Sequence, residues 1–139
     1  MNGFRFSRLQ EVEFRDLDAL GHVNNAVYVS YLESARLAYQ REVLGAEDFE
    51  DLGLVANVQV SFRAPALLGD TLEVGVRVPR VGTKSLHFEY EVRGPGDRLV
   101  AEVTSVHVAF DHELQRTVPV PEEWRRRIEE HEAGVLTTT

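Results

Sequence analysis

A short polar stretch, Asp16 to Asn25, holds the residue types from which a hydrolytic site is built. It contains two carboxylates, Asp16 and Asp18, the imidazole of His22, and adjacent amides at Asn24 and Asn25. A carboxylate in such a loop can act as a nucleophile or as a general base. If a helix starts at the asparagines, its unpaired N–H groups and positive dipole end suit the oxyanion that forms when a carbonyl is attacked.

The same residue types are also ordinary in turns and helix caps, and a strand-to-helix loop rich in them is more often structural than catalytic. Strand parity does not separate the two aspartates, because both would share a face with Val12 and Phe14 if a strand continued into the loop. The residue types alone therefore leave the function of the stretch open.

A long helix is predicted directly after this stretch. Between Asn24 and Leu44, apolar and small residues recur at spacings of three and four. Asn24 or Asn25 can cap its start, and Gly45 can take the left-handed conformation that ends a helix. The polar stretch thus leads into the N-terminus of one helix of about five turns.

After the helix the apolar period changes to two, which predicts strands over 58–63, 72–78 and 86–92. A fourth run, 99–110, is apolar on both faces for part of its length and is expected to be central in the sheet. Short links rich in glycine favour an antiparallel meander. A weaker strand over 9–14, with a charged face, is expected at an edge.

The C-terminal region is predicted to form a short helix over about 121–132. Pro121 can open it, and Trp124 and Ile128 are expected to hold it as a solvated appendage. Strands and helices in this order predict an α+β fold in which one antiparallel sheet covers one long helix. The chain of 139 residues is expected to form a single domain, 1–139, with its core at about 9–111.

Composition excludes several classes of function. A formal net charge of -8 opposes binding to nucleic acid and to anionic membranes. The absence of cysteine excludes disulfides, a thiol nucleophile and a thiolate zinc site. No metal site is expected, because His107 and His112 would fall on opposite faces of a strand. The first nine residues lack a signal-peptide apolar run, so a cytoplasmic protein is expected.

The polar stretch also carries a family resemblance. Asp16-x-Asp18-x-x-Gly21-His22-Val23-Asn24-Asn25-x-x-Tyr28, followed by Tyr31-Leu32-Glu33-x-Ala35-Arg36, resembles the signature of hotdog-fold acyl-CoA thioesterases of the 4-hydroxybenzoyl-CoA thioesterase family. The resemblance implies a five-stranded antiparallel sheet wrapped around one long central helix, with a short C-terminal helix. It also implies hydrolysis of an acyl-CoA thioester to the free acid and CoA.

The resemblance assigns roles by position. Asp18 would be the nucleophile or general base, and the backbone N–H of Asn25 would polarise the thioester carbonyl. His22 would order the loop or assist water. Another branch of the fold uses a carboxylate on the helix, for which Glu33 is the candidate, but it lies roughly 12 Å along the axis from Asn25. Glu33 is expected instead to pair with Arg36.

Coenzyme A, as part of substrate and product, is the only cofactor implied. The turn around Lys84, the single lysine, is the best candidate for binding the phosphates of CoA, because it combines hydroxyl groups, a positive charge and a glycine. The resemblance further implies a homodimer, expected to pair into a dimer of dimers, with active sites at the subunit interface. The expected substrate- and CoA-binding residues are Thr83, Lys84, Ser85, Arg63, Asn57 and Gln59.

Two other functions remain as alternatives. One is a hotdog dehydratase acting on 3-hydroxyacyl thioesters, and the other is a non-catalytic module that binds acyl-CoA. The sequence leaves open the acyl group and whether its carrier is CoA or acyl carrier protein.

Overall fold

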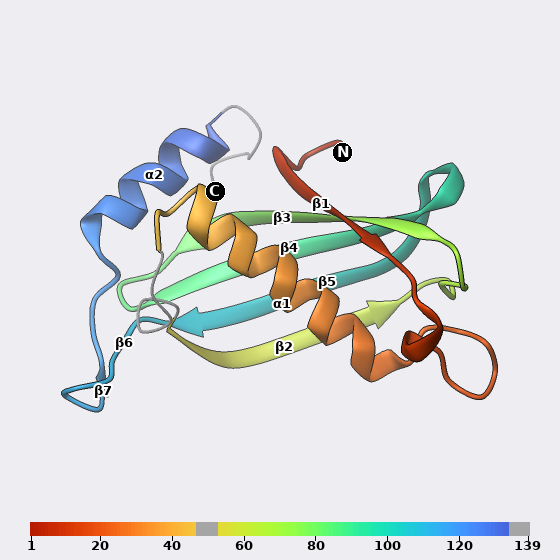
Figure 1. Cartoon of the computed structure of the whole chain (residues 1–139). Helices are drawn as coiled ribbons and strands as arrows, with labels where there is room; N and C mark the ends of the chain where they lie inside the picture. The colour runs from red at the N-terminus through yellow and green to blue at the C-terminus, as the bar shows by residue number, and fades with distance from the viewer. Residues whose placement is uncertain (47–52, 134–139) are drawn as a thin grey trace.

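The computed structural model describes residues 1–46 and 53–133. In this part of the chain, helix α1 (Asn25–Glu42) lies across one face of a five-stranded antiparallel sheet (Figure 1). The α+β hotdog arrangement predicted from the sequence is confirmed. The strands are β1 (Phe6–Glu11), β2 (Leu54–Phe62), β3 (Thr71–Val81), β4 (Ser85–Gly94) and β5 (Arg98–Val108).

The order of the strands in the sheet is β1-β3-β4-β5-β2. The predicted meander is therefore correct for β3, β4 and β5, but β1 and β2 are placed at the two edges. The edge position expected for the first strand is confirmed. β5 is an inner strand but not the central one, because β4 has two strands on each side.

The first strand differs from its prediction at both ends. It begins at Phe6 and ends at Glu11, and the chain then turns through a short 3-10 helix, η1 (Phe14–Asp16). Phe14, whose apolar side chain suggested a continuing strand, is 80% exposed. Asp16 is the last residue of this turn and Asp18 follows it, so both lie beyond the end of β1 and do not share a strand face.

The core lies between α1 and the sheet. Buried apolar side chains recur on one face of α1 and meet alternate residues of the inner strands, such as Phe88 in β4. The ring of Tyr39 contacts Phe6 and Phe88 edge-on, at centroid distances of 5.4 Å and 5.9 Å. Such contacts add to the free energy gained by burying the rings.

The C-terminal helix α2 (Glu122–Glu132) follows a small hairpin of β6 (Phe110–Asp111) and β7 (Arg116–Thr117). It is more than a solvated appendage. Ile128 is buried, and the buried carboxylate of Glu132 accepts hydrogen bonds from the Tyr39 hydroxyl, at 2.7 Å, and from the Val78 N–H, at 3.2 Å. Burial and the neighbouring Glu132 raise the pKa of Tyr39. Helix α2 thus closes one end of the core.

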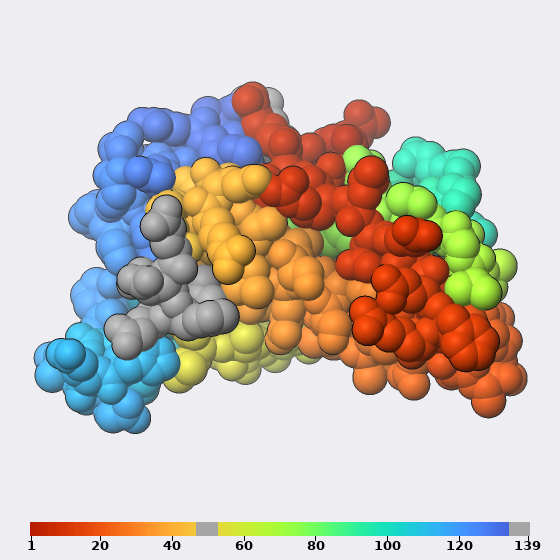
Figure 2. Space-filling model, viewed as in Figure 1, coloured from red at the N-terminus to blue at the C-terminus, as the bar shows by residue number. Residues whose placement is uncertain are grey.

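Strand β2 is exposed along almost its whole length, although its alternating apolar residues predict a half-buried strand. Val55, Val58 and Phe62 are 45%, 39% and 45% exposed. This edge of the sheet extends past the cover that α1 provides, and Figure 2 shows β2, in yellow, at the surface beside α1, in orange. A single copy of the chain leaves both apolar side chains and backbone groups of β2 open.

Candidate active site

The loop between β1 and α1 is a compact, hydrogen-bonded structure. The Asp18 N–H donates to the His22 carbonyl at 2.8 Å, which closes the loop on itself. A β-bridge between Leu17 and Val23 joins the two sides of the loop, and a second β-bridge, between His22 and Leu67, joins the loop to the segment after β2. Gly21 has a φ of +79°, a left-handed conformation that glycine adopts without strain. The loop therefore holds its side chains at fixed positions next to the start of α1.

Asp16 has a structural role in this loop. Its Oδ2 accepts hydrogen bonds from the Tyr31 hydroxyl of α1, at 2.5 Å, and from the Glu13 N–H, at 3.0 Å. Burial raises its pKa, but the hydrogen bonds from Tyr31 and Glu13 and the charge of Arg15 outweigh burial, so the pKa lies below its ordinary value. Burial, and next the hydrogen bond to Asp16, raise the pKa of Tyr31. Asp16 thus fastens the loop to the helix.

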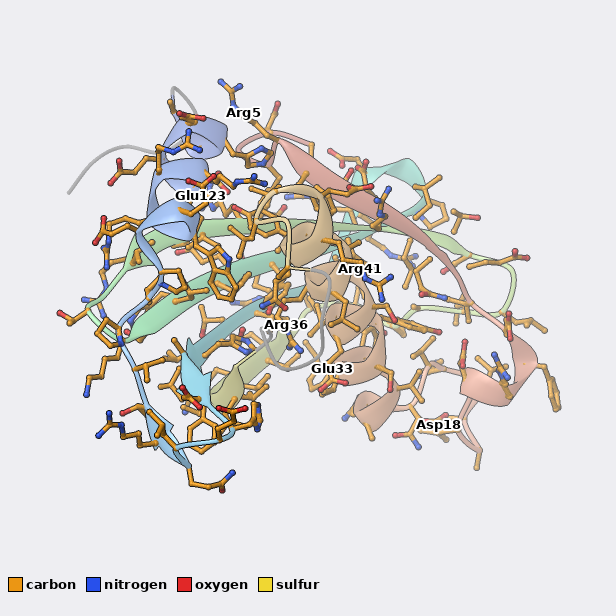
Figure 3. All side chains as sticks on the ribbon, turned by 60° about the vertical axis from the view of Figure 1, so that its left-hand side comes forward. Arg5, Asp18, Glu33, Arg36, Arg41 and Glu123 are labelled. Carbon is orange, nitrogen blue, oxygen red and sulfur yellow. The ribbon has the colours of Figure 1, made fainter. Side chains whose placement is uncertain are left out.

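Asp18 is exposed and belongs to the turn itself. Its Oδ1 accepts hydrogen bonds from the N–H groups of Leu20, at 2.9 Å, and His22, at 3.3 Å. Its second oxygen has no partner among residues 1–46 and 53–133. The carboxylate is therefore fixed by one oxygen and open on the other. Figure 3 shows Asp18 beyond the N-terminal end of α1.

The start of α1 offers the N–H groups expected for an oxyanion. Asn24 is the N-cap, and its side chain accepts a hydrogen bond from the Ala26 N–H at 2.9 Å, which resolves the choice between the two asparagines. The N–H of Asn25, the first helical residue, has no partner in the described part of the chain. It is one of the free donors that a helix N-terminus presents, at its positive dipole end.

Apolar surface surrounds this polar loop. Leu20, in the same turn as Asp18, is 79% exposed, and Leu67, which bridges to His22, is 42% exposed. Tyr28, one turn into α1, is buried, and its ring packs against the ring of Phe62 with the two centroids 5.4 Å apart. The loop therefore combines one open carboxylate, one open N–H and an apolar border.

The hairpin expected to contact CoA lies at the other end of the sheet. The carbonyl of Lys84 accepts a hydrogen bond from the N–H of Ala109, just beyond the end of β5. The segment after β2, which is bonded to the Asp18 loop, donates hydrogen bonds to the carbonyl of Val100, near the start of β5. Because β5 has 11 residues, the two ends are roughly 30 Å apart. Within one chain, Thr83, Lys84 and Ser85 are therefore not brought together with Asp18.

The remaining expected binding residues also lie apart from the open face of Asp18. Asn57 and Gln59 pair with Val106 and Thr104 on the side of the sheet turned away from α1. Arg63 lies at the same end as the Asp18 loop, but its guanidinium donates to Glu102 at 2.9 Å. His22 is half-buried, and its backbone N–H and carbonyl order the turn.

Sequence reasoning missed a polar cluster beneath α1. The Tyr90 hydroxyl and Ser105 Oγ lie 2.7 Å apart, and Ser105 Oγ lies 2.9 Å from His107 Nε2. Burial, together with the nearby charge of Arg36, lowers the pKa of His107 to about 3, so its imidazole is neutral. The signal was present in the sequence, since Ser105 and His107 share the parity of buried Val103.

The expected ion pair between Glu33 and Arg36 is not formed. Among residues 1–46 and 53–133, no carboxylate lies within 4 Å of the Arg36 guanidinium. In the same part of the chain, no three His, Asp or Glu side chains gather where a metal ion could bind. Neither α1 nor α2 has the length and apolarity needed to cross a membrane.

Comparison with known proteins identifies what the chain resembles. The family model of the thioesterase-like superfamily matches residues 12–128. A thioesterase from Thermus thermophilus, whose crystal structure is described as a complex with coenzyme A and Zn, is 40% identical, with a TM-score of 0.87 over 95% of this chain and 97% of that chain.

Two curated relatives are more distant. The long-chain acyl-CoA thioesterase FadM of Escherichia coli is 26% identical over 121 residues, which is 82% of this chain and 89% of that protein. An acyl-acyl carrier protein thioesterase of Arabidopsis thaliana is 24% identical over 134 residues, which is 90% of this chain and 70% of that protein.

Proposed function

Because the chain belongs to the thioesterase-like superfamily and is a thioester hydrolase, we propose that it hydrolyses acyl-CoA thioesters at the loop before α1. The observation that carries the proposal is the placement of two open groups in one ordered loop. One oxygen of Asp18 is fixed by N–H groups of its own turn, and the other is available. The N–H of Asn25, which has no partner among residues 1–46 and 53–133, marks the adjacent helix start.

The proposed chemistry follows from these groups. As a general base, Asp18 takes a proton from water, whose oxygen forms a bond to the thioester carbonyl carbon. The negative charge that develops on the carbonyl oxygen is stabilised by the N–H of Asn25 and the positive end of α1. The C–S bond then breaks, and the thiolate of CoA leaves and takes up a proton. As a nucleophile, Asp18 would form an anhydride that water hydrolyses.

Asp16 is the less suitable carboxylate. Its Oδ2 already accepts two hydrogen bonds, and its lowered pKa makes it a weaker base. The roles of the two aspartates therefore separate on hydrogen bonding: Asp16 holds the loop to the helix, and Asp18 acts on the substrate.

The proposed active unit is a homodimer formed through β2. In the described part of the chain this strand has no neighbour on its outer side and carries exposed apolar side chains, and single chains seldom leave such an edge uncovered. Antiparallel pairing of two β2 edges would place the β3–β4 hairpin of each copy at the same end of the joined sheet as the other copy's Asp18. Lys84 of a second copy would then supply the positive charge for the CoA phosphates.

CoA is the proposed carrier. The relative of 40% identity was crystallised with coenzyme A, and the FadM relative is named for acyl-CoA. The acyl carrier protein thioesterase is the more distant match in identity, at 24%. Tests with CoA esters therefore come first.

The test is thiol release from a panel of aryl and fatty acyl-CoAs by the wild-type chain and by Asp18→Asn. The asparagine keeps the Oδ1 acceptor of the turn, so we expect a folded protein whose kcat is lower by about 10²- to 10⁴-fold. Asp111→Asn is the matched control, because the Oδ1 of Asp111 also accepts two N–H groups of its own turn, from Glu113 and Leu114.

Three outcomes would contradict the proposal. Undiminished turnover by Asp18→Asn would exclude the role of that carboxylate. An enoyl product without free thiol would indicate a dehydratase instead. Tight binding of the whole panel without hydrolysis would indicate a binding module.

A further inference from the structure

The turn between β3 and β4 carries basic side chains that have no close carboxylate. Arg80 lies near the end of β3 and Lys84 lies in the turn, and in the described part of the chain neither forms an ion pair within 4 Å. Arg77, on the same face of β3, is by contrast paired with Glu89 of β4 at 2.7 Å. A chain with a formal net charge of -8 therefore keeps one positively charged turn.

Arg80 is held by His87 of the neighbouring strand rather than by an acid. Its Nη2 lies 2.8 Å from His87 Nε2, and Ser85 Oγ lies 3.2 Å from the same nitrogen. A guanidinium can only donate, so Nε2 is the acceptor and the imidazole is neutral. Burial, and next the positive charge of Arg80, lower the pKa of His87, which favours the same neutral form. A guanidinium and a hydroxyl thus meet at one uncharged acceptor.

Helix α2 fixes this turn from its other side. The half-buried Arg125 donates to the carbonyl of Gly82 at 2.9 Å, and the N–H of Val120 donates to the carbonyl of Thr83 at 2.9 Å. Within the turn, the N–H of Gly82 donates to the carbonyl of Ser85 at 2.8 Å. Figure 1 shows α2 at the end of the sheet where β3 and β4 are joined. The donors are therefore positioned before a ligand arrives, which lowers the entropic cost of binding one.

A phosphate monoester suits these donors. A guanidinium binds phosphate through parallel N–H groups, and only one of the five N–H groups of Arg80 is needed for His87. A monoester presents three acceptor oxygens and a charge of about -1.5 to -2 at pH 7, so it can accept from Arg80 and Ser85 while it lies near the charge of Lys84. A phosphorus inside a diphosphate bridge has fewer free oxygens and less charge. CoA carries such a monoester, its 3′-phosphate, beside its diphosphate.

The turn also lies where CoA would reach it in the proposed homodimer. Arg80, His87, Val106 and Asn57 are paired in succession across β3, β4, β5 and β2, on the face of the sheet turned away from α1. Four strand spacings of about 4.8 Å, or roughly 19 Å, separate β3 from the β2 of a second copy, and the Asp18 of that copy would lie at this end of the joined sheet. An extended ligand could then run from that Asp18 to Arg80.

We propose that Arg80 and Ser85, positioned by His87, bind the 3′-phosphate of CoA and select CoA over carriers that lack it. The inference rests on the proposed function and names its carrier. In acyl carrier protein the phosphate of the phosphopantetheine arm is a diester to the protein, so that arm has no terminal phosphate for these donors. Esters of CoA are therefore expected to be the better substrates.

The test is direct binding of CoA and of 3′-dephospho-CoA, measured by calorimetry, so that it does not depend on turnover. We expect the wild-type chain to bind CoA about 10- to 100-fold more tightly, since hydrogen bonds between charged groups are lost with the 3′-phosphate. Inorganic phosphate added to both titrations should reduce the difference, because it competes for the same donors.

Variants assign the preference to its residues. Arg80→Met should remove the preference for CoA, whereas Arg41→Met should retain it, because Arg41 is also exposed and without an ion pair among residues 1–46 and 53–133 but lies on α1. His87→Leu, which lacks the acceptor for Arg80, should reduce the preference, and His87→Gln, which keeps an acceptor, should retain most of it. A merely structural role of His87 would change both affinities alike and leave their ratio unaltered.

Equal affinities of the wild-type chain for CoA and 3′-dephospho-CoA would overturn the proposal, as would a preference that survives in Arg80→Met. An equal loss of preference in Arg41→Met would also overturn it, because the preference would then reflect net charge alone. Equal ratios in the two His87 variants would overturn the positioning role of His87. Failure of the proposed function would have a different mark: the wild-type chain would still prefer CoA, but no acyl-CoA would release thiol.

Discussion

Replacing Asp16 by asparagine should lower the free energy of unfolding at neutral pH. The carboxylate accepts from the Tyr31 hydroxyl at 2.5 Å and from the Glu13 N–H at 3.0 Å through the same oxygen. Hydrogen bonds to a charged group contribute about 1.5 to 3 kcal/mol, and an amide oxygen retains part of this, so we expect a loss of about 1 to 3 kcal/mol. For a domain of this length the loss corresponds to a decrease in Tm of about 3 to 10 °C.

The loss should depend on pH in a defined direction. The pKa of Asp16 is lower in the folded chain than its ordinary value of 3.8, so its carboxylate stabilises the fold above that value. This stability is lost as the pH falls through the folded pKa. Wild type and Asp16→Asn should therefore differ most near pH 7 and converge as the pH falls below about 4.

Urea unfolding at equal protein concentration, at several values between pH 7 and pH 3.5, measures both effects. Tyr31→Phe should cost a similar amount, and the double variant should cost less than the sum because the two side chains share one hydrogen bond. Asp97→Asn is the control, since the side chain of Asp97 is 85% exposed and its ion pair with Arg93 is 3.8 Å long. Equal stability of Asp16→Asn and wild type at pH 7, or a difference that persists unchanged at pH 3.5, would refute the reasoning.

Two further substitutions test the loop and the sheet edge. Gly21→Ala should lower the free energy of unfolding by about 1 kcal/mol, because φ is +79° while nothing lies within 4 Å of an added Cβ; thermal unfolding checks this, and an unchanged Tm would contradict it. Val55→Asp, at a residue 45% exposed on β2, should leave the monomer folded but abolish the proposed homodimer; light scattering at micromolar concentration checks this, and a persisting dimer would show that β2 is not the interface.

The fold was predictable where local periodicity and burial agree. The three-and-four spacing of α1 and the alternation in β3, β4 and β5 each reflect a face that packs within one chain. The two edge strands were harder. Phe14 extends the apolar alternation of β1, but its side chain is exposed and the chain turns before it. The sheet order was also hidden, because short hairpins indicate a meander only for the strands that they join.

The candidate site was predictable as a segment but not as a set of roles. Residue types and parity left Asp16 and Asp18 equivalent, and the resemblance alone favoured Asp18. The difference between them depends on Tyr31, which lies 15 residues away in the chain. Likewise, alternation on β2 predicts burial for Val58, but burial there requires a surface that the single chain does not provide. Contacts of this kind depend on tertiary or quaternary packing rather than on a local pattern.

Helix α1 links three parts of the molecule through successive turns of its inner face. Tyr31 holds the loop of Asp18 through Asp16, Arg36 shares a hydrogen bond with Tyr90 of the polar cluster, and Tyr39 bonds to Glu132 of α2. All three side chains project from one rigid element. A shift of the loop relative to α1 would therefore move Asp18 relative to the N–H of Asn25, so we expect loss of the hydrogen bond between Tyr31 and Asp16 to affect catalysis as well as stability. In Tyr31→Phe, kcat for acyl-CoA hydrolysis should therefore fall together with the free energy of unfolding, and steady-state thiol release beside urea unfolding measures both.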